Sequence, residues 1–225
     1  MTGVDGKDAE MRSKFDEQLQ ELNNEMIEMG RMIVQSIAMA IEALTNKDEK
    51  LAKQIMEGDS EIDRAQKRIE SICFQLLIRQ QPVAKDLRVV TAAMKMVTDM
   101  ERIGDHAADI SEMTILMGRG SRIGDFSHIS RMSSETMRML NHSIEAYVEK
   151  DREKAREVIL QDDIVDELFD QVKRDIIGLI RRNPGDGEEA TDLLMVAKYF
   201  ERIGDHATNI AEWVIYSLKK TEEEV

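Results

Sequence analysis

The sequence contains little proline, few aromatic residues and a single cysteine. Pro82 and Pro184 are the only prolines among 225 residues, and aromatic side chains make up 4% of the chain. This scarcity disfavours a sheet protein, and the abundant Met, Leu, Ala, Glu and Lys residues favour long helices. Cys73 has no second cysteine with which to form an internal disulfide, which fits a reducing compartment.

Two further absences bear on location and partners. No apolar run approaches the roughly 18 residues that a membrane-spanning helix needs, and the polar, acidic residues 1–10 do not resemble a signal peptide. The net charge of −14 argues against a nucleic-acid partner, because binding to a polyanion depends on clustered Lys and Arg side chains. We therefore expect a cytoplasmic protein with no nucleic-acid partner and no direct membrane insertion.

Apolar residues recur at helical spacing along most of the chain. Between Phe15 and Leu44 they follow one another at intervals of three and four residues, which is typical of one face of an amphipathic helix. Pro82 is expected to begin the third helix, because proline suits the first turn of a helix. Breaks in the pattern divide the chain into six long helices, and they lie at residues 46–48, 80–82, 118–127, 150–151 and 183–187.

Two halves of the chain are related in sequence. The residues ERIGDHA at 101–107 recur unchanged at 201–207, and a second block matches at a shift of 103 residues, pairing Asp59 with Asp162. Such a repeat predicts an all-α fold made of two tandem repeats of an antiparallel three-helix bundle. The first repeat is expected at residues 10–118, the linker at 119–126 and the second repeat at 127–220.

Acidic residues lie at matching distances on either side of the proline turn. Asp59 and Asp63 precede it by as many residues as Glu101 and Asp105 follow it, so in an antiparallel hairpin the two pairs lie at the same height. Residues four apart share one helix face, and the pairs are expected to face each other, with Asp109 one turn further along. The second repeat places four residues in the same way: Asp162, Asp166, Glu201 and Asp205.

Facing carboxylates repel each other unless something neutralises them. A bound multivalent cation would do so, and oxygen ligands suit Mg²⁺, Ca²⁺, Mn²⁺ or iron. The alternative is a pair of solvated acidic faces, neutralised by salt bridges from Arg102 and Arg202. His106 and His206 point about 140° away from the glutamates around the helix. We expect them to pack, or to form an interface, rather than to bind metal.

Four stretches resemble the PhoU family of phosphate-uptake regulators. Residues 79–88, RQQPVAKDLR, resemble that family's hairpin signature, the two ERIGDHA runs its acidic motifs, and residues 210–216, IAEWVIY, its usual ending. The resemblance covers residues 15–218 and implies a PhoU-like fold of two three-helix bundles side by side. It also implies metal clusters, with Asp59, Asp63, Glu101 and Asp105 matching one site and Asp162, Asp166, Glu201 and Asp205 the other.

The resemblance further implies a non-enzymatic negative regulator of phosphate uptake and phosphate signalling. The implied partners are the ATPase subunit of the phosphate ABC transporter and a membrane sensor histidine kinase, and a second copy of the chain is a further candidate. Iron, zinc, manganese and magnesium are the candidate metals. The repeats differ where Asp109 is replaced by Asn209, so the two sites are expected to hold cations unequally.

Two other functions remain open from the sequence. The first is a carboxylate-bridged helical-bundle metalloenzyme or metal store, which is weakened because the Glu-x-x-His pairs typical of di-iron bundles are missing. The second is a helical adaptor that binds no metal.

Overall fold

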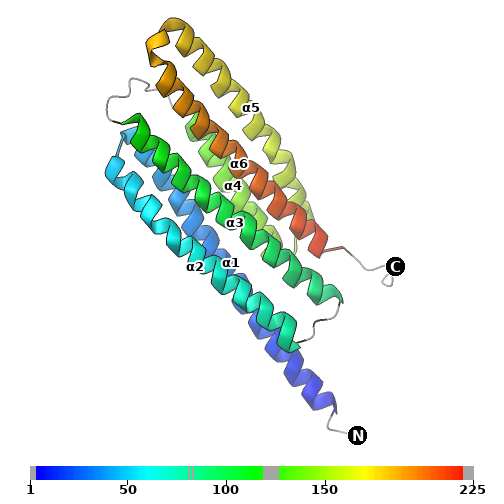
Figure 1. The fold of residues 1–225 in the computed structure, drawn as a ribbon. Helices are drawn as coiled ribbons and strands as arrows, with labels where there is room; N and C mark the ends of the chain where they lie inside the picture. Colours follow the sequence, from blue (N-terminus) through cyan, green and yellow to red (C-terminus); the bar gives the residue numbers. More distant parts are fainter. Residues whose placement is uncertain (1–3, 81, 83, 119–126, 220–225) are drawn as a thin grey trace.

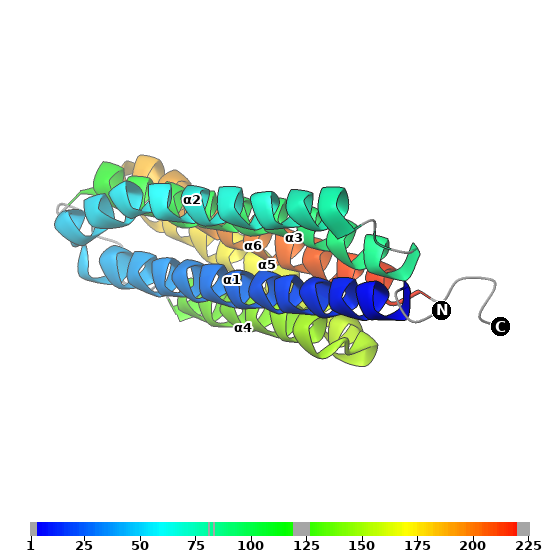
Figure 2. The ribbon, with the colours of Figure 1, turned by 90° about the horizontal axis from the view of Figure 1, so that it is seen from below.

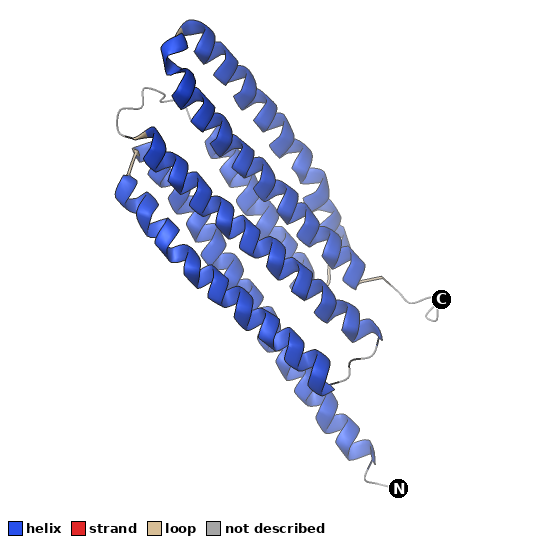
Figure 3. Ribbon diagram, viewed as in Figure 1, coloured by secondary structure: helices blue, strands red, loops and turns tan. Residues whose placement is uncertain are grey.

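The structure is a computed structural model that describes residues 4–80, 82, 84–118 and 127–219. These residues form helices and short turns, and no strand occurs in the described ranges (Figure 3). The all-α fold with six long helices is confirmed. In chain order the elements are α1 (Val4–Asn46), α2 (Glu49–Gln80), α3 (Ala84–Met117), α4 (Ser127–Glu149), α5 (Arg152–Arg182), the 3-10 turn η1 (Pro184–Asp186) and α6 (Gly187–Ser217).

The helices form two three-helix bundles that lie side by side (Figure 1). Helices α1, α2 and α3 pack on one another, and so do α4, α5 and α6. The bundles meet where α3 packs against α6 and where α1 packs against α4, as both views show (Figure 2). The two predicted repeats are therefore two bundles with a shared seam, and none of their described helices is long and apolar enough to cross a membrane.

Three boundaries differ from the sequence-based expectation or cannot be compared with it. Helix α1 already begins at Val4, before the expected start of the first repeat at residue 10. Helix α3 begins at Ala84 and not at Pro82, because proline suits the residues just before a helix as well as its first turn. The expected linker, residues 119–126, lies outside the described residues.

The repeated Lys-Asp dipeptides make the same turn in both bundles. Lys47 and Lys150 have positive φ angles of 54° and 58°, which let the chain leave one helix sharply and enter the next. The side chain of Asp48 accepts hydrogen bonds from the amides of the next helix's first turn, and so does that of Asp151. Such capping stabilises a helix start by about 1 kcal/mol. The second block of sequence that the repeats share therefore includes the turn between the first two helices of each bundle.

The core runs the length of both bundles and is built mainly of Met, Leu, Ile and Ala side chains. Met100 and Phe200 stand directly before Glu101 and Glu201 and are fully buried. Long, flexible methionine side chains fill irregular gaps between helices. The acidic residues therefore extend from helices whose other faces are fixed in the core.

Candidate metal centres

The repeated glycine brings the helices of each hairpin close together beside the acidic residues. A Cβ atom on Gly104 would lie 3.0 Å from two carbon atoms of Ile62 and 3.6 Å from Oδ1 of Asp59. A Cβ atom on Gly204 would lie 2.8 Å from Oδ1 of Asp162 and 3.5 Å from Cγ1 of Val165. Both aspartates thus lie against the backbone of the opposite helix, which only glycine leaves free at this distance.

In the first repeat this contact brings carboxylates from α2 and α3 to one level. Burial, reinforced by the negative charges of Asp105, Asp63 and Asp109, raises the pKa of Asp59 to about 6. The pKa of Glu101 is also raised, chiefly by burial and then by Asp105, while Arg102 opposes the shift. A carboxyl group with a raised pKa resists ionisation, so this cluster favours a positive charge among its oxygens.

The second repeat has the same electrostatic character. Burial raises the pKa of Asp162 to about 6, with Asp166 as the strongest of the charges that add to the effect. Burial is also the main cause of the raised pKa values of Asp166 and Asp205, and in both cases Glu201 is the next cause. The four residues predicted for this site therefore interact with one another, as do those of the first site.

Each cluster contains one cation from its own helix. Nη1 of Arg102 lies 3.0 Å from Oδ2 of Asp105, and its Nε lies 3.6 Å from Oε2 of Glu101. In the second repeat the cation is Lys198, which forms an ion pair with Glu201. Arg102 thus behaves as the salt-bridge alternative expected, whereas sequence reasoning missed Lys198. Its spacing of three residues before Glu201 was the available signal.

The two histidines meet at the seam between α3 and α6, which confirms the expected interface. Their ring centroids are 5.7 Å apart. Nδ1 of His106 lies 3.0 Å from Oδ2 of Asp109 on the same helix, whereas Nδ1 of His206 lies 2.9 Å from Oδ1 of Asp99 on the other repeat. Burial is the main cause of the lowered pKa of His106.

The two residues at the end of the predicted ligand set have different surroundings. The amide Nδ2 of Asn209 donates to Oδ1 of Asp99 at 3.2 Å and so is held by α3. The negative charge of Asp109 helps to raise the pKa of Asp59, after burial and the charges of Asp105 and Asp63. Oδ2 of Asp109 is also within hydrogen-bonding distance of Nδ1 of His106. The structure therefore joins Asp109 to the first cluster and ties Asn209 to the seam. Asp99 was not identified from the sequence, because its role depends on the packing of α3 against α6.

The chemistry of the donor set favours hard cations. All of the clustered donors are carboxylate oxygens, the ligands that Mg²⁺, Ca²⁺ and Mn²⁺ prefer. In residues 4–80, 84–118 and 127–219, however, no three Asp, Glu, His or Cys side chains already stand in an arrangement that holds a metal ion. The residues fit such an ion in type and position along the helices, and their side chains would have to turn inward to hold it.

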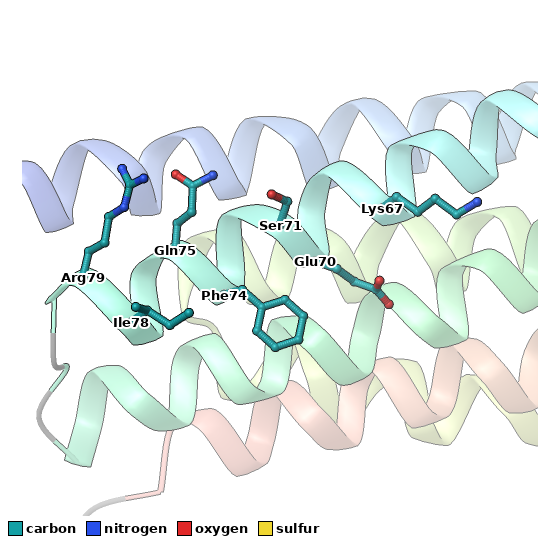
Figure 4. Close-up of a pocket in the computed structure, with 7 residues that line it drawn as sticks. All are labelled: Lys67, Glu70, Ser71, Phe74, Gln75, Ile78 and Arg79. Atoms are coloured by element: carbon teal, nitrogen blue, oxygen red, sulfur yellow. The ribbon is translucent and has the colours of Figure 1, made fainter.

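A groove of about 540 Å³ on α2 is a second feature that sequence reasoning missed. Figure 4 shows Phe74 and Ile78 on the α2 side that borders α3. Phe74 is 51% exposed and Ile78 is 75% exposed, although both are large apolar residues. Lys67, Glu70 and Arg79 also line the groove, so it is apolar in the middle and charged at its edges. Phe74 and Ile78 lie off the face of α2 that carries the buried residues Ile69, Cys73 and Leu76.

Comparison with known proteins gives two lines of similarity. The family described as the PhoU domain matches twice, at residues 26–114 and 129–214. A phosphate-specific transport system accessory protein PhoU homolog from Clostridium acetobutylicum is 37% identical over 206 residues, covering 91% of this chain and 94% of the relative. A homolog of the same description from Aquifex aeolicus is 35% identical and covers 84% of this chain and 86% of its own length.

Solved structures agree with these matches. The crystal structure of PhoU from Pseudomonas aeruginosa superposes with a TM-score of 0.84 at 30% identity, covering 91% of this chain and 98% of that one. The structure of the phosphate transport system regulatory protein PhoU from Streptococcus pneumoniae gives a TM-score of 0.82 at 28% identity, covering 90% and 96%. The double match corresponds to the two bundles described above.

Proposed function

The chain belongs to the PhoU domain family, and on that premise we propose that it is a cytoplasmic negative regulator of phosphate uptake and phosphate signalling. Its relatives are accessory proteins of the phosphate-specific transport system, which supports a regulatory role alongside a transporter. The proposed partners are the ATPase subunit of the phosphate ABC transporter and a sensor histidine kinase. Regulation would act through contact with them and not through catalysis.

We further propose that each hairpin holds one or more multivalent cations. The observation that carries this proposal is the raised pKa, about 6, of Asp59 and of Asp162, each of which lies against the opposite helix among other carboxylates. A cation would favour the ionised form of these groups and relieve their repulsion. Manganese, magnesium and iron fit the all-oxygen donors best, and zinc is a weaker candidate.

Within this proposal the cations brace the hairpins. The acidic groups of each cluster come from two helices of one bundle, so a bound cation would join α2 to α3 or α5 to α6. A ligand that binds only the folded chain stabilises it by mass action, by about 2.7 kcal/mol at a hundred times its Kd. The regulatory contact would then be made by other surfaces of the braced bundle.

A deletion strain tests the regulatory proposal. With a phosphate-starvation reporter in rich phosphate, deletion should switch the reporter on, and the parent gene should silence it again. The variant Glu101→Gln/Glu201→Gln alters both clusters, and Glu112→Gln/Glu212→Gln is its matched control because these exposed glutamates are also equivalent in the two repeats. If deletion leaves the reporter silent, in an organism that has this signalling pathway, the regulatory assignment is wrong.

The same strains separate bracing from signalling. If the cations brace the hairpins, a folded Glu101→Gln/Glu201→Gln variant at normal abundance should still restore repression. Loss of repression by that variant but not by its control would mean that the cations take part in the signal. Metal analysis of the purified parent protein distinguishes the remaining alternative, because an adaptor without metal would hold less than one ion per chain under saturating Mn²⁺ or iron.

A further inference from the structure

A cavity of about 350 Å³ lies at the end of the molecule where the two repeats come together. The first turns of α3, the turn between α4 and α5 and the last residues of α6 all border it, and Figure 2 shows these ends close to one another near the start of α1. The cavity is level with the first turns of α3, several helical turns before Glu101 on the same helix. Its charged lining residues are Lys85, Arg88, Lys150, Lys219, Asp16 and Asp86.

The lining is positively charged in a strongly acidic protein. Four cationic and two acidic side chains give the cavity a net charge of +2, whereas the whole chain carries −14. The Nζ atom of Lys219 lies 5.8 Å from the centre of the Tyr216 ring. Lys85, Lys150 and Lys219 are exposed at the rim of the cavity and Arg88 is half-buried, so their excess of positive charge would attract an anion.

Arg88 provides a second, independent observation. Its Nη2 donates to the backbone oxygen of Lys219 at 2.9 Å, which ties the start of α3 to the end of α6. Its Nε is buried and has no hydrogen-bond partner in the described part of the chain. A buried charged donor without an acceptor is costly. The planar guanidinium group is suited to oxyanions, because it can offer two parallel N–H donors to two oxygens.

We propose that this cavity binds a phosphate-type oxyanion, either inorganic phosphate or the phosphate monoester of a lipid headgroup. The net charge of +2 matches the dianion that predominates near neutral pH, and the volume admits such a group with ordered water. Lys85 and Arg88 would approach it from α3, Lys150 from the turn between α4 and α5, and Lys219 from the end of α6. Binding there would join both repeats at one end, independently of any cation in the acidic clusters.

Calorimetric titration of the full chain with inorganic phosphate tests the proposal, with chloride used to hold the ionic strength constant. We expect saturable binding of one phosphate per chain and a higher melting temperature. The variant Lys85→Gln/Lys150→Gln should weaken binding by about tenfold or more, since two charge-assisted contacts are lost. Arg88 is left unchanged in this variant because it also holds the end of α6.

The matched control is Lys53→Gln/Lys95→Gln, which removes the same charge from exposed positions on α2 and α3 outside the cavity. It should bind phosphate as the parent does, and equal losses in the two variants would overturn the proposal by showing general charge attraction. A flotation assay with vesicles of phosphatidylcholine, with or without phosphatidic acid, distinguishes the two sources. Vesicle binding that depends on Lys85 and Lys150, without binding of free phosphate, would assign the site to a headgroup. Absence of both kinds of binding would refute it.

Discussion

The two acidic clusters share a motif and a fold position but differ in the residues around them. Both contain an aspartate held against a glycine of the opposite helix, with its pKa raised to about 6. In the first cluster the cation is Arg102, which contacts Asp105 from within the motif. In the second it is Lys198, which precedes the motif and pairs with Glu201.

The histidines extend this difference to the seam. His106 bonds to Asp109 on its own helix, whereas His206 bonds across the seam to Asp99. The position equivalent to Asp99 in the second repeat is Tyr199, whose ring centroid lies 5.5 Å from that of His106. Identical ERIGDHA sequences therefore make different contacts, because the residues on either side of the motif differ.

The largest expected effect concerns the core beneath each cluster. Met100→Ala and Phe200→Ala each remove a fully buried side chain next to the acidic glutamate. Truncation of this kind costs about 3 kcal/mol for methionine and about 4 kcal/mol for phenylalanine, through lost burial and the cavity left behind. Denaturant unfolding of metal-free protein would measure both values. A larger cost at Met100 would mean that the first repeat, and not the second, is the less adaptable half.

The pH dependence of stability compares the clusters directly. The pKa of Asp59 and that of Asp162 are raised from 3.8 to about 6 in the folded chain, so the folded state holds these protons more tightly than the unfolded state. Their contribution is fully present below pH 3.8 and is lost as the pH rises through 6. Solvent screening reduces the cost of ionisation to about 1 kcal/mol for each group. At pH 5 about half of this contribution is still present, so metal-free protein should be less stable at pH 8 than at pH 5 by about 1 kcal/mol.

Single variants divide this loss between the repeats. Asp59→Asn and Asp162→Asn should each remove about half of the difference in unfolding free energy between pH 5 and pH 8, and Glu57→Gln on the outside of α2 serves as the control. Saturating Mn²⁺ should abolish the difference in the parent, because the cation favours the ionised carboxylates. Unequal halves would show that the clusters are not electrostatically equivalent.

The apolar periodicity and the internal repeat were enough to predict the fold. They also predicted the height along the helices at which the acidic residues of each cluster lie. Asp48 and Asp151 mark turns because a local hydrogen bond determines their role. The equal distances of Asp59 and Asp105 from Pro82 placed the two acidic pairs of the first repeat together. The contacts of Asp99 and the cation pairing of Lys198 were not predicted. The first depends on how α3 packs on α6, and the second on side-chain directions, neither of which one helix's periodicity determines.

The asymmetry between Asp109 and Asn209 should appear as unequal cation affinity. Asp109→Asn removes a negative charge beside Asp59 and should weaken the first site by about tenfold, or about 1.4 kcal/mol. Asn209→Asp should not strengthen the second site correspondingly, because the new carboxylate would face Asp99, to which the amide now donates. Both effects can be measured by titrating Mn²⁺ into proteins in which only one of the two clusters is left intact. Equal affinities of the two sites in the parent would refute the asymmetry.

The smallest expected effect concerns the cation of the second cluster. Lys198→Thr introduces the residue that occupies the equivalent position, Thr98, in the first repeat. The ion pair with Glu201 is partly exposed, so its loss should change the unfolding free energy by no more than about 0.5 kcal/mol. The positive charge also opposes the burial-driven rise of the pKa values of Asp166 and Asp205, and it would repel an incoming cation.

Removing that charge should therefore raise the affinity of the second site for Mn²⁺ by about fivefold, which corresponds to about 1 kcal/mol of repulsion at this separation. Lys173→Thr is the matched control, because Lys173 also forms an ion pair on its own helix, with Asp170, and lies over the same Phe169 ring as Lys198. It should leave the affinity unchanged. If both variants raised the affinity equally, the gain would come from the net charge of the chain, and Lys198 would have no specific place in the cluster.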